Sequence, residues 1–481
     1  MHNLVVHPTG LLLTQTVNMP EGETVTGPNF TRTLTVTATP PPGQTLTNVD
    51  VTQSLPNSVR IASITPGTGG VITSVTVGST TLTDPGAITA IMAVNPYLTS
   101  YTVRYARLTA PATTVVNFFV PEKDQAGADV LDPVTGDNRT ITFGAPTATG
   151  QWLPLDSRDQ TVVDPGPPAI VGPATITANG RETSFVAKSV ALHKAMAIST
   201  NAGNPGLTPG DELQYTLNID LSDYFAIGKT LFGAGELKIV DTVADGQSII
   251  ANSTQVSLDY NGQTLLLPMI TSIAPGLPGS GTSIITFDIA QSLLDNNAIF
   301  GGALIGDIAI DGVINGATRM VISYRTSVNQ AYGSTYTQSE INEGDSVGNN
   351  ATISGTLLAS DVRLTGESES DSSSASLTVP THTVATSILT VNGSTPPANV
   401  ELKPGDVVTF KLAYNLETGD YEQFKLTAYL PLPLFELGAA GTTWSAWTTG
   451  AGNTSTDPVD TVKVGAGNSL IFDFGSYATA D

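Results

Sequence analysis

The strongest constraint on the fold is a short segment that occurs twice in the chain. Residues 207–217 read LTPGDELQYTL and residues 402–412 read LKPGDVVTFKL, so Leu, Pro, Gly, Asp, an aromatic residue and a final Leu match in register. Pro followed by Gly favours a type II turn, because Pro fixes φ at the second turn position and Gly accepts a positive φ at the third. The alternation after the Asp predicts a strand. We therefore expect repeated β-domains.

Similar strands flank both copies of this segment. The upstream strands read VALHKAMAI at 190–198 and VATSILTV at 384–391. The downstream strands read ELKIVDTVADG at 236–246 and FKLTAYLP at 424–431. A weaker third copy lies near the start of the chain, with LLLTQTV at 11–17, FTRTLTV at 30–36 and LTNVDVTQSLP at 46–56. The repeat therefore predicts three units.

Two segments of biased composition indicate where these units meet. The sequence DPGPP at 164–168 is typical of a stiff linker, and the polar stretch GESESDSSS at 366–374 is either a linker or an exposed final strand. We predict domains at 1–168, 169–380 and 381–481. The last range is much shorter than the others, so we expect either the truncated start of a third domain or a smaller third domain.

The overall composition excludes several classes of function. Nineteen Lys and Arg against 42 Asp and Glu give a net charge of −23, which repels nucleic acid and anionic membrane surfaces. The absence of Cys excludes disulfides, thiolate metal sites and cysteine nucleophiles. A hydrophobic content of 40% is enough for folded cores. No stretch is long and apolar enough for a transmembrane helix, and no secretory signal is visible.

The local patterns favour strands almost everywhere. Residues 33–38 and 283–289 alternate with period two between Gly, Pro and Asn clusters. Helical periodicity is confined to two short candidates, at 222–231 and 290–300. We predict an all-β chain of tandem Ig-like β-sandwiches in an extended array.

The order of these motifs resembles a known family. An aliphatic strand, a PGD turn, an aromatic-containing strand, VDTV at 240–243 and, much later, NNATIS at 349–354 are similar to the Ig-like repeats of bacterial surface proteins, related to isopeptide-forming fimbrial and adhesin backbone domains. The resemblance implies a non-enzymatic, extracellular structural subunit or stalk of a surface layer, fibre or large adhesin. It also implies neighbouring copies or other surface proteins as partners.

The resemblance further implies an intramolecular isopeptide bond in the second unit. In such domains a buried, neutral Lys attacks the carboxamide of an Asn while a protonated acid polarises the carbonyl. The matching residues are Lys194, Asp241 and Asn350, or its neighbour Asn349.

Two observations in the sequence bear on this interpretation. Lys194 shares a face with Leu192, Met196 and Ile198, an unusual position for an exposed Lys. At the register-matched positions the first unit has Gln15 and Gln53 and the third has Leu389 and Ala428, so Lys and Asp are present or absent as a pair. This joint presence or absence is expected of a buried ion pair, because either charge alone would be buried without its partner.

Alternative readings of these residues stay open at this stage. Lys194 can be a solvent-facing strand residue, Asp241 a turn former, and Asn349 and Asn350 loop residues. Lys188, which shares its face with Val186 and Val190, competes with Lys194 as the reactive lysine.

Calcium is the possible cofactor. Acidic clusters offer the carboxylates of Asp132, Asp137, Glu343, Asp345 and Asp420 as Ca²⁺ ligands. None of the clusters has EF-hand spacing, so each can equally be an ordinary solvated turn.

Other chemistry finds little support in the residue inventory. The four histidines, at positions 2, 7, 193 and 382, show no paired ligand spacing, and no catalytic motif occurs. Trp444 and Trp447 can stack on a sugar or fill a core. The alternative function is therefore an extracellular binding module that recognises a glycan or a partner protein through its sandwich loops.

Overall fold

The chain is almost entirely β-structure. The computed structural model describes residues 10–152, 174–430, 463–465 and 469–477, apart from gaps at 202–205, 261, 297–300, 310–315, 335–340, 360–363, 382, 398 and 415–420. Within these residues, mostly antiparallel sheets are accompanied by only two short α-helices. The predicted fold class, tandem β-sandwiches, is confirmed. No helix in this part of the chain is long and apolar enough to cross a membrane.

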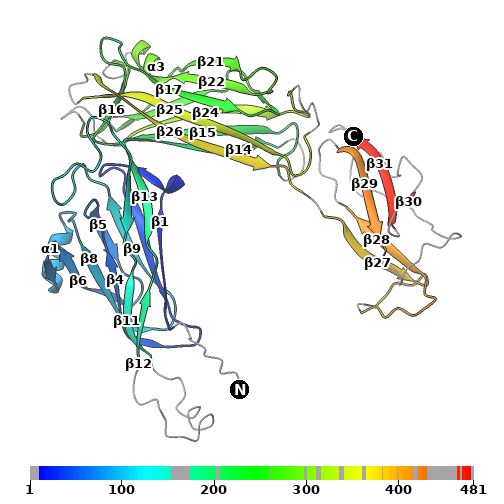
Figure 1. The fold of residues 1–481 in the computed structure, drawn as a ribbon, viewed down its shortest axis with the longest axis horizontal. Helices are drawn as coiled ribbons and strands as arrows, with labels where there is room; N and C mark the ends of the chain where they lie inside the picture. Colours follow the sequence, from blue (N-terminus) through cyan, green and yellow to red (C-terminus); the bar gives the residue numbers. More distant parts are fainter. Residues whose placement is uncertain are drawn as a thin grey trace, which may run out of the picture.

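The first domain occupies the blue-to-cyan part of Figure 1. Its elements are β1 (Leu12–Asn18), η1 (Pro20–Gly22), β2 (Glu23–Val25), β3 (Arg32–Thr39), β4 (Leu46–Ser54), β5 (Arg60–Thr65), β6 (Gly70–Val77), β7 (Thr80–Leu82), α1 (Pro85–Met92), β8 (Ser100–Leu108), β9 (Ala112–Phe119), β10 (Arg139–Phe143), β11 (Thr147–Trp152), β12 (Ala174–Asn179) and β13 (Thr183–Lys188).

Two sheets enclose the core of this domain. The sheet β1-β3-β9-β5 faces the six-stranded sheet β12-β11-β4-β8-β6-β7, and Tyr105 of β8 meets Thr114 of β9 in a buried 3.0 Å hydrogen bond between them. Alternation explains the packing, because β3 buries Leu34 and Val36 and leaves its Thr residues half-exposed. A third, short sheet, β10-β13-β2, extends toward the second domain.

The second domain is the green-to-yellow part of Figure 1. Its elements are β14 (Val190–Thr200), β15 (Glu212–Leu221), β16 (Ala226–Gly228), β17 (Leu237–Val243), β18 (Gln247–Ile249), β19 (Gln255–Tyr260), β20 (Gln263–Leu266), β21 (Ile270–Pro275), β22 (Ser283–Asp288), α3 (Ile289–Asp295), β23 (Ala303–Ile305), β24 (Thr318–Val328), β25 (Ser346–Leu358) and β26 (Leu364–Thr378).

This domain is also a two-sheet sandwich. The sheet β14-β15-β24-β19-β20 packs on the sheet β21-β22-β17-β25-β16-β23, while β18 pairs with β24 and β26 pairs with β25. Strand β15 buries every second residue, from Leu213 through Tyr215 to Leu221. Phe287 of β22 packs on Tyr324 of β24 with ring centroids 5.8 Å apart, so the two inner faces meet in one core.

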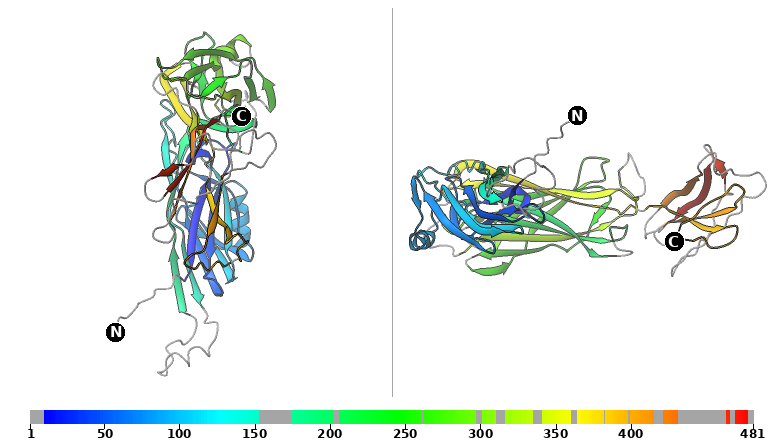
Figure 2. Two further views of the ribbon diagram at one scale, coloured as in Figure 1. Left: turned by 90° about the vertical axis from the view of Figure 1, so that its right-hand side faces the viewer. Right: turned by 90° about the horizontal axis from the view of Figure 1, so that it is seen from below.

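The third segment lies beyond the far end of the second domain in Figures 1 and 2. It contains two small sheets, β27-β28 and β29-β31-β30. The strands are β27 (Ala385–Val391), β28 (Val408–Ala413), β29 (Tyr421–Tyr429), β30 (Lys463–Gly465) and β31 (Ser469–Tyr477).

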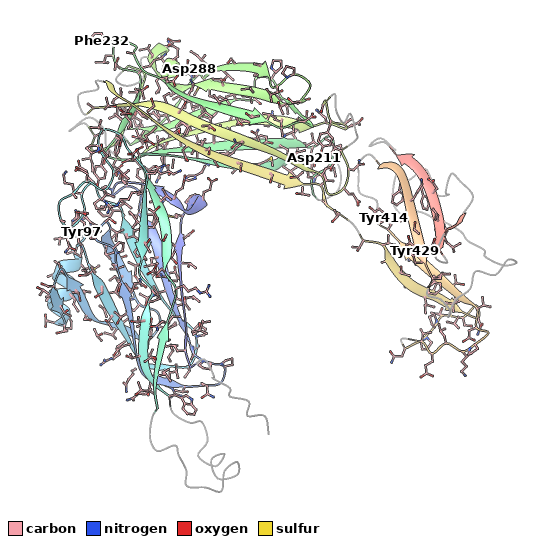
Figure 3. All side chains as sticks on the ribbon, in the orientation of Figure 1. Tyr97, Asp211, Phe232, Asp288, Tyr414 and Tyr429 are labelled. Carbon is pink, nitrogen blue, oxygen red and sulfur yellow. The ribbon has the colours of Figure 1, made fainter. Side chains whose placement is uncertain are left out.

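The structure shows the repeat in three dimensions. In each unit the first two matched strands pair antiparallel, β1 with β3, β14 with β15 and β27 with β28, and the third matched strand lies in a different sheet. The PGD turns also agree, because Gly210 and Gly405 have φ of +92° and +94°. In both turns the Asp carboxylate accepts a backbone N–H three residues earlier, at 2.8 Å for Asp211 (labelled in Figure 3) and 2.7 Å for Asp406.

The helix expectations were half right. Helix α3 lies where a helix was expected, and Asp288 caps it by accepting the N–H of Gln291 at 3.0 Å. The helix predicted at 222–231 is wrong, because Ala226 and Ile227 pair with β23 and β25 and Gly228 has a φ of +135°.

The first domain extends past its expected boundary at residue 168. Strands β12 and β13 pair with β11 and β10 of the first domain, so its sheets run to Lys188. The expected linker at 164–168 lies outside the described residues. The polar stretch at 366–374, which the sequence left open, is part of strand β26.

The first two domains meet in a buried, hydrogen-bonded junction. The chain passes from β13 to β14 through Ser189 alone, and the domains lie at a steep angle there (Figure 1). Thr26 and Ser222 share a buried 2.6 Å side-chain hydrogen bond, and Asp223 accepts the backbone and side-chain N–H groups of Asn29 at 2.9 and 3.1 Å. The junction is therefore packed like a core, unlike a flexible linker.

Candidate functional site

A polar cluster lies between the two sheets of the second domain. Lys194 comes from β14 and Tyr324 from β24 of one sheet, whereas Asp241 comes from β17 and Asn349 from β25 of the other. Strand alternation turns all four side chains inward, as the apolar face of β14 predicted for Lys194. The alternative that Lys194 faces solvent is excluded, because its side chain is 0% exposed.

The centre of the cluster is a buried ion pair. Lys194 Nζ lies 2.6 and 2.7 Å from the two carboxylate oxygens of Asp241, whose side chain is also fully buried. The pair joins the two sheets directly. Such a pair is strongly coupled, since removal of one charge leaves the other buried without a partner.

Tyr324 connects the ion pair to an asparagine. Its hydroxyl donates to Asp241 Oδ2 at 2.7 Å and accepts from Asn349 Nδ2 at 2.6 Å. Asn349 is buried, and its Oδ1 has no hydrogen-bond partner among the described residues. The carboxamide of Asn349 thus ends a hydrogen-bonded series that starts at Lys194.

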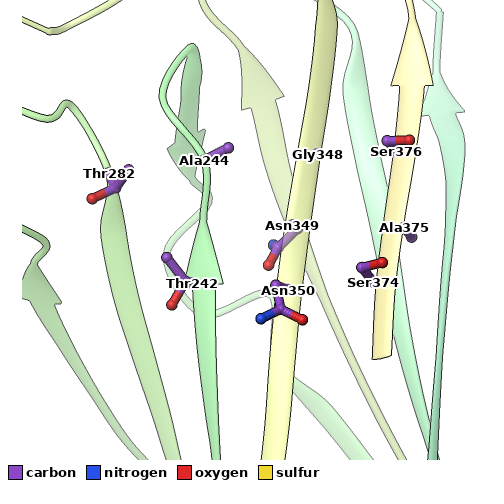
Figure 4. A pocket seen from close by; sticks show the side chains of 9 residues that line it. All are labelled: Thr242, Ala244, Thr282, Gly348, Asn349, Asn350, Ser374, Ala375 and Ser376. Carbon is purple, nitrogen blue, oxygen red and sulfur yellow. The ribbon is translucent and has the colours of Figure 1, made fainter. Parts of the chain in front are cut away.

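Asn350 faces the other way. It is exposed and lines an open hollow along β17, β25 and β26, together with residues such as Thr242 and Ser374 (Figure 4). Because neighbouring residues of a strand point to opposite faces, only one of the two asparagines can face Lys194. The structure assigns that position to Asn349.

Burial disfavours the charged form of both Lys194 and Asp241. Loss of solvation lowers the pKa of Lys194 to about 8, against the opposing attraction of Asp241. Loss of solvation also raises the pKa of Asp241 above its ordinary value, against the attraction of Lys194. A proton shift from ammonium to carboxylate therefore needs less free energy here than in water.

Aromatic rings exclude water from this cluster. Tyr215 and Tyr324 stack with centroids 5.0 Å apart, and Lys194 Nζ lies 4.7 Å from the Tyr215 ring centroid. Tyr215 donates to Gln247 at 2.5 Å, so its hydroxyl is satisfied within the core. Sequence analysis missed both tyrosines as site residues, although Tyr215 is the aromatic residue of the repeated segment.

The cluster holds the groups that amide formation between Lys and Asn requires. A neutral Lys194 Nζ would attack Cγ of Asn349, the C–N bond of the carboxamide would break, and the nitrogen would leave as ammonia after taking up the displaced protons. Protonated Asp241 would donate a hydrogen bond to the developing oxyanion and return to its starting state. No oxidant or external acid is needed.

The competing lysine, Lys188, is also buried but in a different place. It lies at the domain junction, where its Nζ contacts the carboxylates of Glu23 and Asp371. The first domain has amides at the matched positions: Gln15 and Gln53 both donate to the backbone oxygen of Gly144, at 3.2 and 2.7 Å.

Among the described residues expected to bind calcium, Asp132 and Asp137 flank one surface turn, and Glu343 and Asp345 lie at another. Asp132 accepts the backbone N–H groups of Val134 and Thr135, and Asp345 accepts that of Asn342. Asp420, Trp444 and Trp447 lie outside the described residues. Within the part of the chain that is described, the group of three carboxylate or imidazole ligands within mutual reach is a different one, Glu21, Glu23 and His193.

The solved structures that are similar to this chain include domains of bacterial surface proteins. No family model matches the chain, and no curated protein matches it. Similar solved structures include the collagen-binding domain of the Erysipelothrix rhusiopathiae surface protein RspB, at 11% identity and a TM-score of 0.21 over 75% of this chain and 94% of that one. The full-length major pilin SpaD of Corynebacterium diphtheriae is similar at 10% identity and a TM-score of 0.22, over 98% of this chain and 82% of that one.

A third similar structure is the collagen-binding subdomain of the Enterococcus faecalis surface protein ACE. It is 12% identical, with a TM-score of 0.20, over 38% of this chain and 94% of that one. These neighbours are adhesin and pilin domains, the class of bacterial surface protein that the sequence resembles. The fold described above rests on the sheets themselves, because TM-scores this low support no finer comparison.

Proposed function

We propose that this chain is a load-bearing structural segment of a bacterial cell-surface assembly, without enzymatic activity toward other molecules. The observation that carries the proposal is the buried set of Lys194, Asp241 and Asn349 between the two sheets of the second domain. Its chemistry is directed at the chain itself. An amide bond between Lys194 and Asn349 would lock the domain covalently.

The position of these two residues suits a mechanical role. Strand β14 receives the chain from the first domain, and β25 is followed by β26, from which the chain continues to the third segment. A bond between β14 and β25 would carry tension past the strands that lie between them in the sequence. Those strands would stay folded under a load that otherwise peels the sandwich apart.

The rest of the molecule supports a stalk. The first two domains share a hydrogen-bonded junction, which resists bending. The net charge of −23 keeps neighbouring chains apart and soluble, and the chain is built from repeated sandwiches. We place this segment outside the cell, among copies of itself or other surface proteins.

Intact mass under denaturing conditions tests the chemistry. The wild-type chain is expected to weigh one ammonia less than its sequence, because bond formation expels the amide nitrogen of Asn349. The variants Lys194→Ala, Asp241→Ala and Asn349→Ala are each expected to show their full theoretical mass.

Asn350→Ala is the matched control, since it removes the neighbouring carboxamide from the outer face. It should keep the deficit of one ammonia. A wild-type chain of full mass would rule out the bond. A deficit lost in Asn350→Ala and kept in Asn349→Ala would overturn the assignment of the asparagine.

Single-molecule stretching tests the role. With the bond in place, the second domain is expected to give no extension from the residues between Lys194 and Asn349. The Lys194→Ala chain should release that length at a definite unfolding force. Equal extension in both chains would contradict a load-bearing crosslink.

A further inference from the structure

Three potential metal ligands come together at the junction of the first two domains. Glu21 and Glu23 belong to the turn and strand that follow β1, and His193 lies on β14 of the second domain. A carboxylate oxygen of each Glu and a ring nitrogen of His193 all lie within 4.8 Å of one another. The three residues therefore converge although the chain separates them by a whole domain.

Three of the polar atoms in this group are buried without a hydrogen-bond partner among the described residues. His193 is 8% exposed, and within the described structure neither Nδ1 nor Nε2 has a partner. Glu23 is also 8% exposed, and its Oε1 is equally unsatisfied by any described residue. Nδ1 and Oε1 lie 3.9 Å apart, too far for a hydrogen bond. Buried polar atoms are rarely left unpaired, so this arrangement indicates a missing ligand.

The local charge has the sign that a cation requires. Lys188 Nζ is shared between Glu23 Oε2 and Asp371 Oδ1. Among the described residues, the hydrogen bond that Glu21 accepts comes from the neutral hydroxyl of Ser373. When ionised, these three carboxylates face one ammonium group, which leaves an excess of two negative charges. A divalent cation would compensate that excess.

The remaining contacts hold the ligands in place. Asp371 Oδ2 accepts the backbone N–H of Leu192 at 2.7 Å, and Ser373 Oγ accepts that of Lys194 at 2.8 Å. These bonds fix β26 against β14 on both sides of His193.

We propose that Glu21, Glu23 and His193 bind one divalent transition-metal cation of the Zn²⁺ class, which clamps the first domain to the second. Zn²⁺ bonds of about 2.0–2.2 Å at tetrahedral angles place ligand atoms roughly 3.4 Å apart. The ligand atoms of the observed group lie within 4.8 Å of one another, so they have to close by no more than about 1.4 Å. The imidazole favours Zn²⁺ over Ca²⁺, which takes oxygen ligands. Water can complete the coordination from the side of Glu21, the exposed member.

The inference is independent of the proposed crosslink. The metal ligands lie at the domain junction, and the Lys194→Ala chain keeps all three. The sequence alone did not predict this site, because its ligands show no local spacing and come from two domains.

The test uses the full chain stripped with a chelator and dialysed against Zn²⁺. Elemental analysis is expected to find one tightly held Zn²⁺ per chain, and Zn²⁺ should raise the thermal unfolding midpoint. Calorimetric titration should show that Glu21→Gln and His193→Asn each weaken binding by at least about tenfold. Glu21→Gln removes an exposed carboxylate, so it is expected to fold even where substitution of the buried His193 does not.

Glu236→Gln is the matched control, because it removes an equal charge from an exposed site on the second domain. It should bind Zn²⁺ like the wild type. A wild-type chain that retains no Zn²⁺, or a Glu21→Gln chain that retains as much as the control, would overturn the proposal. Equal affinity for Ca²⁺ and Zn²⁺ would overturn the class of metal.

Discussion

At the scale of single residues, the repeated fold fills one pair of positions in two chemically different ways. The second domain places the charged pair Lys194 and Asp241 there, 2.6 Å apart and fully buried. The first domain places Gln15 and Gln53, which donate to a shared backbone oxygen at 3.2 and 2.7 Å. Neutral amides avoid most of the free energy that desolvation of charges costs. The ion pair is therefore not needed for the fold.

Asp223 makes the domain junction sensitive to pH. Burial raises the pKa of Asp223 from its ordinary value of 3.8 to about 6, against the hydrogen bonds from Asn29. A carboxyl group with a raised folded pKa stabilises the protein below the unfolded pKa, and this stability is lost as pH rises toward the folded pKa. The free energy of unfolding is therefore expected to fall between about pH 4 and pH 6 because of this residue.

Urea unfolding at a series of pH values measures this effect. Asp223→Asn removes the titrating group and keeps its size, so the variant's curve should be flatter than that of the wild type in this window. Parallel curves for wild type and Asp223→Asn would contradict the assignment.

At the scale of elements, strand β26 shows how a polar sequence becomes part of a sheet. Its residues are mainly Ser, Glu and Asp, a composition typical of linkers. It is a strand because it pairs with β25 along most of its length. The side chains of Asp371 and Ser373 also accept backbone N–H groups of β14. They take the place of the carbonyl oxygens that a neighbouring strand would offer. Asp371 and Ser373 are therefore buried at the junction, whereas neighbours such as Ser372 are exposed on the other face of the strand.

Gly27, in the loop between β2 and β3, is a position that tolerates a side chain poorly. It has a φ of +132°, and a Cβ built there would lie 2.1 Å from Oδ2 of Asp223. Gly27→Ala is expected to destabilise the protein by at least about 2 kcal/mol, because both the backbone and the junction must shift. Gly43 has a φ of +73° and open space around it. Gly43→Ala is therefore expected to destabilise the protein through backbone strain alone, by about 1 kcal/mol.

Denaturant unfolding of the two variants distinguishes these effects. The midpoint of Gly27→Ala should fall clearly below that of Gly43→Ala. Equal midpoints would mean that the close approach of Gly27 and Asp223 does not stabilise the junction.

At the scale of the whole molecule, the junction joins two sandwiches into one unit. Val25 and Phe30 of the first domain are buried against Ala191 of the second. Arg319 of the second domain lies 5.0 Å from the centroid of the Phe30 ring, so apolar and cation–π contacts both cross the junction. Neither domain can lose its structure without exposing part of the other's apolar surface.

The first two domains are therefore expected to unfold together. Hydrogen exchange at increasing denaturant should show peptides from β9 and β24 losing protection at the same midpoint, because the domains share a buried junction. In Gly27→Ala both midpoints should move down together. Separate midpoints for the two strands in the wild-type chain would show that the domains are independent.

The sequence determined the local elements and their repetition. The alternation of β3, β14 and β15 and the glycines of the two PGD turns are properties of neighbouring residues, so the strands, the turns and the inward position of Lys194 could be predicted. Only the tertiary structure decided which groups meet. The choice of Asn349 over Asn350, the two tyrosines and the convergence of Glu21, Glu23 and His193 depend on packing between sheets and domains, which no local pattern contains.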